Sequence, residues 1–168
     1  MLVLLYCKEG QYYILFTKRT ETVSVHKGEV SFPGGTYEKK DGTLLETALR
    51  ECTEEIGLMP SDVKLLGELD DFCTVGSNYT VSPFVAVMPW PYPLRLDPVE
   101  VAEAIEVPVS ALLDKANIHQ KSECIDGKSI ISHEYHYGGH IIWGATARIL
   151  MHFLNILTYV MSRHSNNP

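Results

Sequence analysis

The chain has 168 residues, of which 45% are hydrophobic and 21% are charged, and its formal net charge is −7 at pH 7. This length suits one domain with a substantial core and is too short for two, so we expect a single domain at 1–164 and a short polar tail at 165–168. The negative charge argues against long-range attraction to a nucleic-acid backbone, and we expect no nucleic-acid partner.

The N-terminal part of the chain has a hairpin pattern. Leu2–Cys7 and Tyr12–Lys18 are strand-like runs that Lys8-Glu9-Gly10 separates. Glu29–Phe32 then leads into Pro33-Gly34-Gly35, where glycines permit a tight turn and a close approach of the backbone to a ligand. We therefore expect two paired strands followed by a glycine turn.

A helix is predicted directly after this turn. Thr43, with Glu46 three residues later, forms a capping box and predicts the start of the helix. Gly57 followed by Pro60 predicts its end. The apolar positions at helical spacing predict a buried stripe, which comprises Leu45, Leu49, Cys52 and Ile56.

The remainder of the chain alternates between extended and helical patterns. The expected strands cover Val63–Leu69, Phe72–Val75, Val81–Val87, Ile118–Gln120, Ser129–Tyr137 and His140–Trp143. The expected helical segments are Pro98–Ile105, a short turn at Ser110–Asp114 and a closing helix at Gly144–Met161. A mixed sheet between helices follows, so the fold class is α/β and the architecture an α/β/α sandwich.

The apolar run Ile149–Met161 raises the alternative of a membrane anchor. It is shorter than the roughly 20 residues that a transmembrane helix needs. Polar residues fall near helical spacing along it, at Arg148, His152, Asn155 and Ser162. We interpret the segment as an amphipathic helix packed on the domain, without a membrane span.

Charged residues cluster on one face of the helix predicted after the glycine turn. Arg50, Glu51, Glu54 and Glu55 lie within two turns, and side chains three and four apart share a helix face. Like charges at this spacing repel one another, which indicates that a cation is brought to the site. Oxygen ligands favour Mg²⁺ or Mn²⁺, and these ions suit phosphate chemistry. A solvated acidic face is the alternative interpretation.

Gly34 to Leu58 resembles the Nudix box, which runs from a glycine through an acid to Arg-Glu-apolar-any-Glu-Glu-any-Gly-apolar. Arg50–Leu58 matches the second half at every fixed position. In the first half, Asp41 stands where the pattern has glutamate, and eight residues rather than the usual seven separate it from Arg50. This leaves Asp41 and Glu38 as rivals for the role of that acid.

Flanking stretches resemble the coenzyme A diphosphatase subfamily of Nudix hydrolases. The matching segments are 15–20, 28–35, 81–85, 100–103 with 107–108, and 142–147. The subfamily commonly has an arginine four residues before Gly28, where this chain has Ser24. The resemblance implies cleavage of coenzyme A or its derivatives to phosphopantetheine and 3′,5′-ADP. The alternatives are another nucleoside diphosphate, such as NADH or ADP-ribose, and a non-catalytic binding module of Nudix fold.

The resemblance also implies roles for individual residues. Glu51 and Glu55 are the expected metal ligands, and Glu54 is a third ligand or their neighbour in the surrounding shell. Arg50 orients a glutamate through an ion pair. The expected substrate contacts are Arg19, Lys27, Gly34 and Gly35. Glu100 and Glu103 are the candidates for the general base. We interpret His119, His133, His136 and His140 as polar strand or loop residues, because their spacing fits no firm ligand pattern.

The cysteines indicate the compartment. Cys7, Cys52, Cys73 and Cys124 form no Cys-x-x-Cys pair, which is typical of reduced thiols in a cytosol-like compartment. The N-terminus lacks a basic region followed by a small-residue cleavage site, so we expect a cytoplasmic protein. The expected partner is a small-molecule nucleoside diphosphate, and a homodimer is left open.

Overall fold

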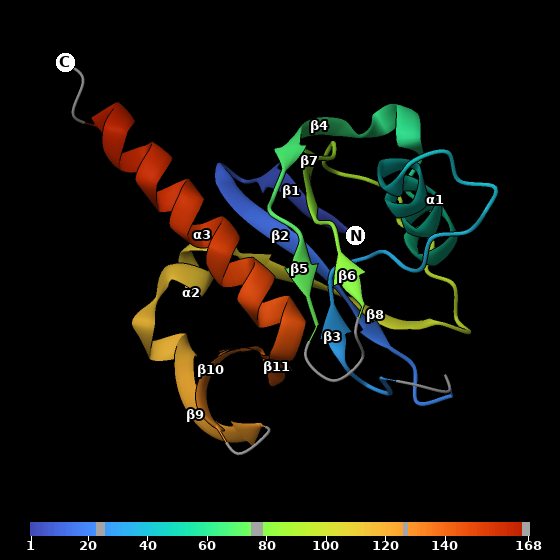
Figure 1. Ribbon diagram of the computed structural model, residues 1–168. Coiled ribbons are helices and arrows are strands. Elements are labelled where there is room, and N and C mark those ends of the chain that lie inside the picture. Colours follow the sequence, from blue (N-terminus) through green and yellow to red (C-terminus); the bar gives the residue numbers. More distant parts are fainter. Residues whose placement is uncertain (23–25, 75–78, 126–127, 166–168) are drawn as a thin grey trace.

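The computed structural model describes residues 1–22, 26–74, 79–125 and 128–165. A mixed six-stranded sheet forms its centre, in the order β3-β2-β1-β7-β4, with β8 pairing to β2 (Figure 1). These strands are β1 (Leu2–Lys8), β2 (Gln11–Arg19), β3 (Val30–Ser31), β4 (Lys64–Glu68), β7 (Phe84–Val87) and β8 (Val101–Pro108). The β1–β7 pair is parallel and the other pairs are antiparallel, so the predicted mixed sheet is confirmed.

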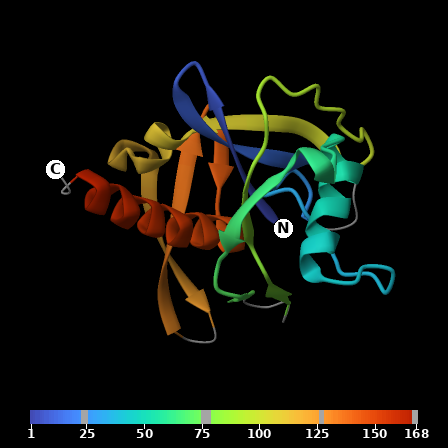
Figure 2. The same ribbon diagram turned by 90° about the horizontal axis from the view of Figure 1, so that it is seen from above.

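Helices cover both faces of this sheet. Figure 2 shows the strands between α1 (Leu44–Ile56) and α3 (Gly144–Ser165). Because neighbouring side chains of a strand point to opposite faces, β1 contributes to two cores: Leu4 packs with Cys52 of α1, and Leu5 with Leu150 of α3. The expected α/β/α sandwich is confirmed.

The ends of α1 lie where the capping residues predict them. The Thr43 side chain accepts a hydrogen bond from the Glu46 backbone N–H at 3.1 Å. At the other end Gly57 adopts a left-handed conformation, with φ 70°, and its N–H bonds back to the carbonyls of the last turn. These caps fix the register of the helix, and with it the direction in which each carboxylate points.

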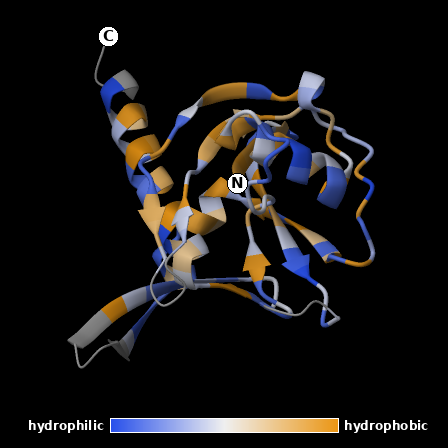
Figure 3. Ribbon diagram, turned by 45° about the vertical axis from the view of Figure 1, so that its right-hand side comes forward, coloured by the Kyte–Doolittle hydropathy of each residue, from blue (hydrophilic) through white to orange (hydrophobic). Residues whose placement is uncertain are grey.

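The closing helix is amphipathic, as expected, and extends to Ser165 rather than ending at Met161. Figure 3 shows hydrophobic and hydrophilic residues alternating along it. Its buried side chains include Ala147, Leu150 and Leu154. None of the helices formed by residues 1–22, 26–74, 79–125 and 128–165 is both long and apolar enough to cross a membrane.

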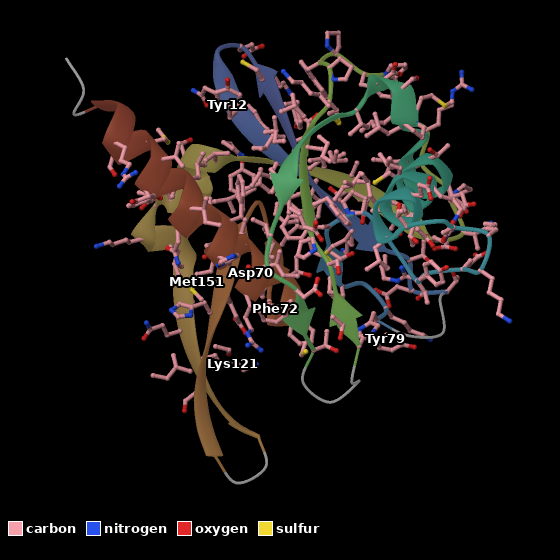
Figure 4. All side chains as sticks on the ribbon, turned by 45° about the horizontal axis from the view of Figure 1, so that its top comes forward. Tyr12, Asp70, Phe72, Tyr79, Lys121 and Met151 are labelled. Atoms are coloured by element: carbon pink, nitrogen blue, oxygen red, sulfur yellow. The ribbon has the colours of Figure 1, made fainter. Side chains whose placement is uncertain are left out.

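Two smaller sheets accompany the central one. One sheet pairs β5 (Phe72–Cys73) with β6 (Thr80–Val81), and the other has the order β11-β10-β9, formed by β11 (His140–Ile142), β10 (Lys128–Tyr137) and β9 (Ile118–Ile125). The remaining elements are the short helix α2 (Val109–Leu113) and the 3-10 turns Pro60–Asp62 and Lys115–Asn117. Figure 4 shows Asp70 and Phe72 beside α3. The Arg148 guanidinium lies 4.2 Å from the centre of the Phe72 ring, and His152 Nε2 lies 3.5 Å from Asp70 Oδ2, so both residues attach this segment to the helix.

Two sequence predictions are wrong. The expected helix at Pro98–Ile105 is instead a turn at 98–100 followed by the start of β8 at Val101, because β8 pairs with β2 along seven registered positions. Long-range pairing has overridden the local pattern. The expected single strand Val81–Val87 is divided between β6 and β7, which belong to different sheets. Pro83 lies between them and has no N–H for a continuous ladder.

Candidate active site

The glycine turn brings the backbone into contact with two carboxylates of α1. The Leu2 N–H donates to the Pro33 carbonyl at 2.9 Å and holds the turn alongside β1. The Gly34 N–H donates to Glu55 Oε2 at 3.0 Å. A Cβ atom built at Gly35 lies 2.4 Å from the carboxyl carbon of Glu51, so any larger residue there would displace the Glu51 carboxylate. The turn thus joins Glu51 and Glu55 in one site.

Arg19 and Glu100 complete this site from two other elements. Arg19 ends β2, and its Nη atoms lie 3.9 Å from Glu55 Oε1 and 4.0 Å from Glu100 Oε2. Both distances exceed that of a hydrogen bond. The buried Nε of Arg19 has no hydrogen-bond partner among the described residues. The Thr20 N–H donates to the Glu100 carbonyl at 3.0 Å, which fixes Glu100 beside Arg19.

Arg50 is the centre of a network that orients the helix carboxylates. Its Nε and Nη2 donate to the two oxygens of Asp41 at 2.9 and 3.1 Å, a bidentate pair. Its guanidinium also contacts Glu51 and Glu54, at 2.9 and 2.8 Å, and donates to the Thr36 carbonyl at 3.1 Å. The spacing of the four charged residues predicted that they share one face of α1. The structure shows that Arg50 neutralises part of the negative charge on that face.

Asp41, rather than Glu38, is the principal acidic partner of Arg50. Asp41 is buried and also accepts hydrogen bonds from the Glu38 N–H and the Thr47 hydroxyl. The hydrogen bonds from Arg50 hold the pKa of Asp41 well below its usual range. Glu38 is exposed, and its carboxylate lies 3.6 Å from Arg50. The role of Thr47 was not predicted from the sequence. Its one indication there is that a polar residue stands on the buried side of α1.

Negative charge is only partly compensated at Glu51 and Glu55. Burial raises the pKa of Glu55 to about 7, and burial also raises the pKa of Glu51. Glu54 differs, since 54% of its side chain is exposed and it turns towards Arg50. The buried carboxylate of Glu55 and the partly buried one of Glu51, beside an open backbone turn, are a donor set that fits a hard divalent cation. Within the described ranges, no three His, Cys, Asp or Glu side chains are grouped closely enough to hold a metal ion by themselves.

The other candidate site residues predicted from the sequence lie away from Glu51 and Glu55. Glu103 pairs with His140 at 3.4 Å and shares its strand face with Ile105, which packs in the core beneath α3. Lys27 is exposed on the connection between β2 and β3, and Ser24 falls outside the described residues. The remaining predicted histidines lie on β9 and β10, where the rings of His119 and His136 are 4.1 Å apart and His133 contacts Gln120.

We expect the metal-free protein to lose stability as the pH rises. The pKa of Glu55 is about 7 in the folded state, against an ordinary value of 4.5. Between these values the folded state binds more protons than the unfolded state, so the free energy of unfolding falls with rising pH, by up to roughly 3 kcal/mol. Mg²⁺ should therefore raise the melting temperature more at about pH 8 than at about pH 5, as thermal melts with and without the ion will show.

The control is the double variant Glu51→Gln/Glu55→Gln, which has neutral amides in place of both carboxylates. It should lose most of the Mg²⁺-induced stabilisation and most of the pH dependence. An equal Mg²⁺-induced shift in this variant would place the ion elsewhere in the protein.

A second prediction concerns Asp41. The substitution Asp41→Asn preserves shape but removes the charge that holds Arg50, so Glu51 and Glu54 lose their fixed orientation. We expect a loss of about 10–100-fold in apparent Mg²⁺ affinity or in turnover, measured by titrating the ion in activity assays. Glu38→Gln is the matched control and should behave like the parent protein. Equal effects of the two substitutions would contradict the assignment of Asp41.

Comparisons with known proteins agree with this architecture. The family model described as the NUDIX domain matches residues 1–126. "Uncharacterized Nudix hydrolase NudL" from Photorhabdus laumondii is 37% identical over 137 residues, which cover 82% of this chain and 73% of that protein.

Solved structures show the same fold at lower sequence identity. A MutT/nudix family protein from Enterococcus faecalis superposes with a TM-score of 0.59 and 17% identity, covering 94% of this chain and 60% of that one. The NUDIX domain of Shewanella oneidensis NrtR, solved with ADP ribose, gives a TM-score of 0.50 and 18% identity, covering 67% of this chain and 72% of that one.

Proposed function

The chain belongs to the NUDIX domain family and is a hydrolase of pyrophosphate bonds in nucleoside diphosphate derivatives, and from this premise we propose that its substrate is coenzyme A or a coenzyme A derivative. The products are then phosphopantetheine and 3′,5′-ADP. The proposal is supported by the stretches before and after the box that resemble coenzyme A diphosphatases, among them 28–35 and 142–147.

The observation that carries cleavage of a diphosphate at this site is the unsatisfied guanidinium of Arg19 beside the carboxylate pair; the flanking stretches support coenzyme A among the diphosphate substrates. Its Nε lacks a hydrogen-bond partner among the described residues, and its Nη atoms are too far from Glu55 and Glu100 for hydrogen bonds. A guanidinium presents five N–H donors, whose geometry matches phosphate oxygens. We assign Arg19 to the diphosphate itself, because it lies against the carboxylates. The exposed Lys27 is then the cation for the 3′-phosphate.

Nudix hydrolases generally use divalent metal ions, and we propose Mg²⁺ or Mn²⁺ for this chain. Glu51 and Glu55 are the residues that hold the ion, with Glu54 as the third acid and the Gly34–Gly35 turn as the backbone contribution. When bound, a divalent cation neutralises charge on the diphosphate oxygens and makes water more nucleophilic. Arg50 keeps Glu51 and Glu54 in place through its ion pairs at 2.9 and 2.8 Å.

For the proton we propose Glu100 as general base. It lies 4.0 Å from Arg19, whereas Glu103 is engaged by His140 on the other side of the sheet. The oxygen of a water molecule forms a bond to one phosphorus, and the bond from that phosphorus to the bridging oxygen breaks. Glu100 accepts the proton that the water loses, and the second phosphate leaves with the bridging oxygen.

The second candidate is the same reaction on ADP-ribose or NADH, which the ADP ribose bound to the Shewanella oneidensis domain favours. The test compares kcat/KM for coenzyme A, dephospho-coenzyme A, ADP-ribose and NADH with Mg²⁺ and with Mn²⁺. We expect coenzyme A to be preferred over dephospho-coenzyme A. Turnover of dephospho-coenzyme A and ADP-ribose equal to that of coenzyme A would contradict the coenzyme A assignment. It would not contradict the assignment as a hydrolase of pyrophosphate bonds.

The remaining proposals concern context. We propose a cytoplasmic protein whose residues 1–164 act as one domain, followed by the short tail. The cysteines Cys7, Cys52 and Cys73 are free thiols, which supports a reducing compartment.

A further inference from the structure

The segment before β8 is attached to the last turn of α1. The Asp97 N–H donates to the Glu55 carbonyl at 2.9 Å. The Arg95 N–H donates to the next carbonyl, that of Ile56, also at 2.9 Å. The last carbonyls of a helix have no partner within the helix, so these bonds satisfy them. The segment is thereby fixed to the backbone of Glu55, one of the two residues proposed to hold the metal ion.

From Asp97 the chain turns into β8 and reaches Glu100 three residues later. The Glu100 N–H donates to the Asp97 carbonyl at 3.2 Å and closes a four-residue turn. Pro98 occupies the second position, where its fixed φ suits such a turn. The Asp97 side chain also closes the turn, because its Oδ1 accepts a hydrogen bond from the Val99 N–H at 2.9 Å. A bond from an aspartate to the backbone two residues later stabilises the turn locally.

Thr20 holds the same residue from the other side. It directly follows Arg19 at the end of β2, it is buried, and its hydroxyl donates to the Val99 carbonyl at 2.7 Å. Side chains from two separate parts of the chain therefore bond to both backbone polar groups of Val99, which directly precedes Glu100. The Val99 side chain is 66% exposed, so its own packing does not account for this hold on its backbone.

The side chain of Glu100 is weakly held by comparison. It is 46% exposed, and its ion-pair partner lies 4.0 Å away, which is too far for a hydrogen bond. The location of the carboxylate therefore depends on the backbone that carries it. We propose that Asp97 and Thr20 are positioning residues for Glu100. They act through the intervening backbone and fix the base relative to the carboxylates of α1. This inference rests on the proposed role of Glu100 as general base.

The test measures kcat and KM with Mg²⁺ and whichever of coenzyme A, dephospho-coenzyme A, ADP-ribose and NADH the parent protein turns over fastest. Asp97→Ala and Thr20→Val remove the two side-chain bonds to Val99. Each should lower kcat about tenfold and leave KM within a factor of about two, because the base is displaced while the substrate contacts remain. Asp97→Asn keeps the acceptor oxygen and Thr20→Ser keeps the hydroxyl, so both should retain most of the parent kcat.

Asp114→Ala is the matched control. The Asp114 Oδ1 accepts from the N–H two residues later, that of Ala116, at 2.9 Å, in the turn that precedes β9. This variant loses the same kind of bond and should keep the parent kcat. Circular dichroism and the melting temperature of every variant show whether a lower kcat accompanies unfolding.

A double-mutant cycle separates positioning from a general structural effect. Glu100→Gln should lower kcat about a hundredfold, and adding Asp97→Ala should cause almost no further loss, because the base is already absent. An equal further loss in the Glu100→Gln background would overturn the proposal. Parent-like kcat in Asp97→Ala or Thr20→Val, or an Asp97→Asn variant as slow as Asp97→Ala, would also overturn it.

Failure of the proposed function gives a different result. Parent-like kcat in Glu100→Gln would contradict the general base, and this inference with it. A loss in Glu100→Gln without a loss in Asp97→Ala would contradict this inference alone. The ratio of kcat/KM for coenzyme A to that for dephospho-coenzyme A tests the substrate separately and should be the same in the parent protein and in each variant.

Discussion

The substitution Glu55→Gln should lower turnover at least about a hundredfold at saturating Mg²⁺, in line with the loss of one catalytic electrostatic group. The amide nearly preserves the shape of the side chain and can still accept the hydrogen bond that the Gly34 N–H donates at 3.0 Å. The substitution removes the buried negative charge. The raised pKa of Glu55 indicates that the surrounding protein stabilises this charge incompletely. The measurement is kcat as a function of Mg²⁺ concentration.

Glu46→Gln is the matched control for this prediction. Glu46 is an exposed acid in the first turn of the same helix, whereas Glu55 lies in its last turn. The variant should retain the kcat of the parent protein. That result would show that turnover depends on the charge of Glu55 and not on the total negative charge of α1. Turnover by Glu55→Gln close to that of the parent protein at saturating Mg²⁺ would remove Glu55 from the metal site.

The second large effect is expected for Arg19→Ala. A charge-assisted hydrogen bond contributes about 1.5–3 kcal/mol, so kcat/KM should fall by about 10–150-fold. Because the guanidinium lies against Glu55 and Glu100, the loss should be similar for coenzyme A and dephospho-coenzyme A, which share the diphosphate. Parallel measurements of kcat/KM for both substrates check this expectation.

Lys27→Ala provides the contrast. If this exposed lysine contacts the 3′-phosphate, its removal should lower kcat/KM for coenzyme A and leave dephospho-coenzyme A unaffected. A loss confined to coenzyme A in Arg19→Ala would instead assign Arg19 to the 3′-phosphate. Removal of a buried ion-pair partner can also destabilise the fold, so the melting temperature of Arg19→Ala is measured in the same buffer.

Several elements could be predicted because their determinants are local. Thr43 and Gly57 cap α1 by contacts within a few residues, and the hairpin of β1 and β2 depends on the short Lys8-Glu9-Gly10 connection. The segment Pro98–Ile105 shows the opposite case. Its residues carry a weak local preference, and the backbone partners that make it part of a strand lie on β2, more than 80 residues earlier in the chain.

The candidate site divides in the same way. Helical geometry alone places Glu51, Glu54 and Glu55 on one face, since residues three and four apart are neighbours. Sequence could not decide between Asp41 and Glu38, because that choice depends on which carboxylate is buried against Arg50. The three-dimensional fold made Asp41 the bidentate partner and left Glu38 at the rim.

The sequence by itself determined the family, the ends of α1 and the acidic face of that helix, because each depends on residues close together in the chain. Only the tertiary structure decided that Arg19 lies beside Glu55 and that Glu100 is in the site while Glu103 is not. The register of β2 and β8 shifts between Lys18 and Arg19, so Lys18 stands opposite Glu103, and Arg19 stands opposite Val101, next to Glu100. A bulge re-aims side chains by sheet pairing, and that pairing joins segments too far apart for any local pattern to specify.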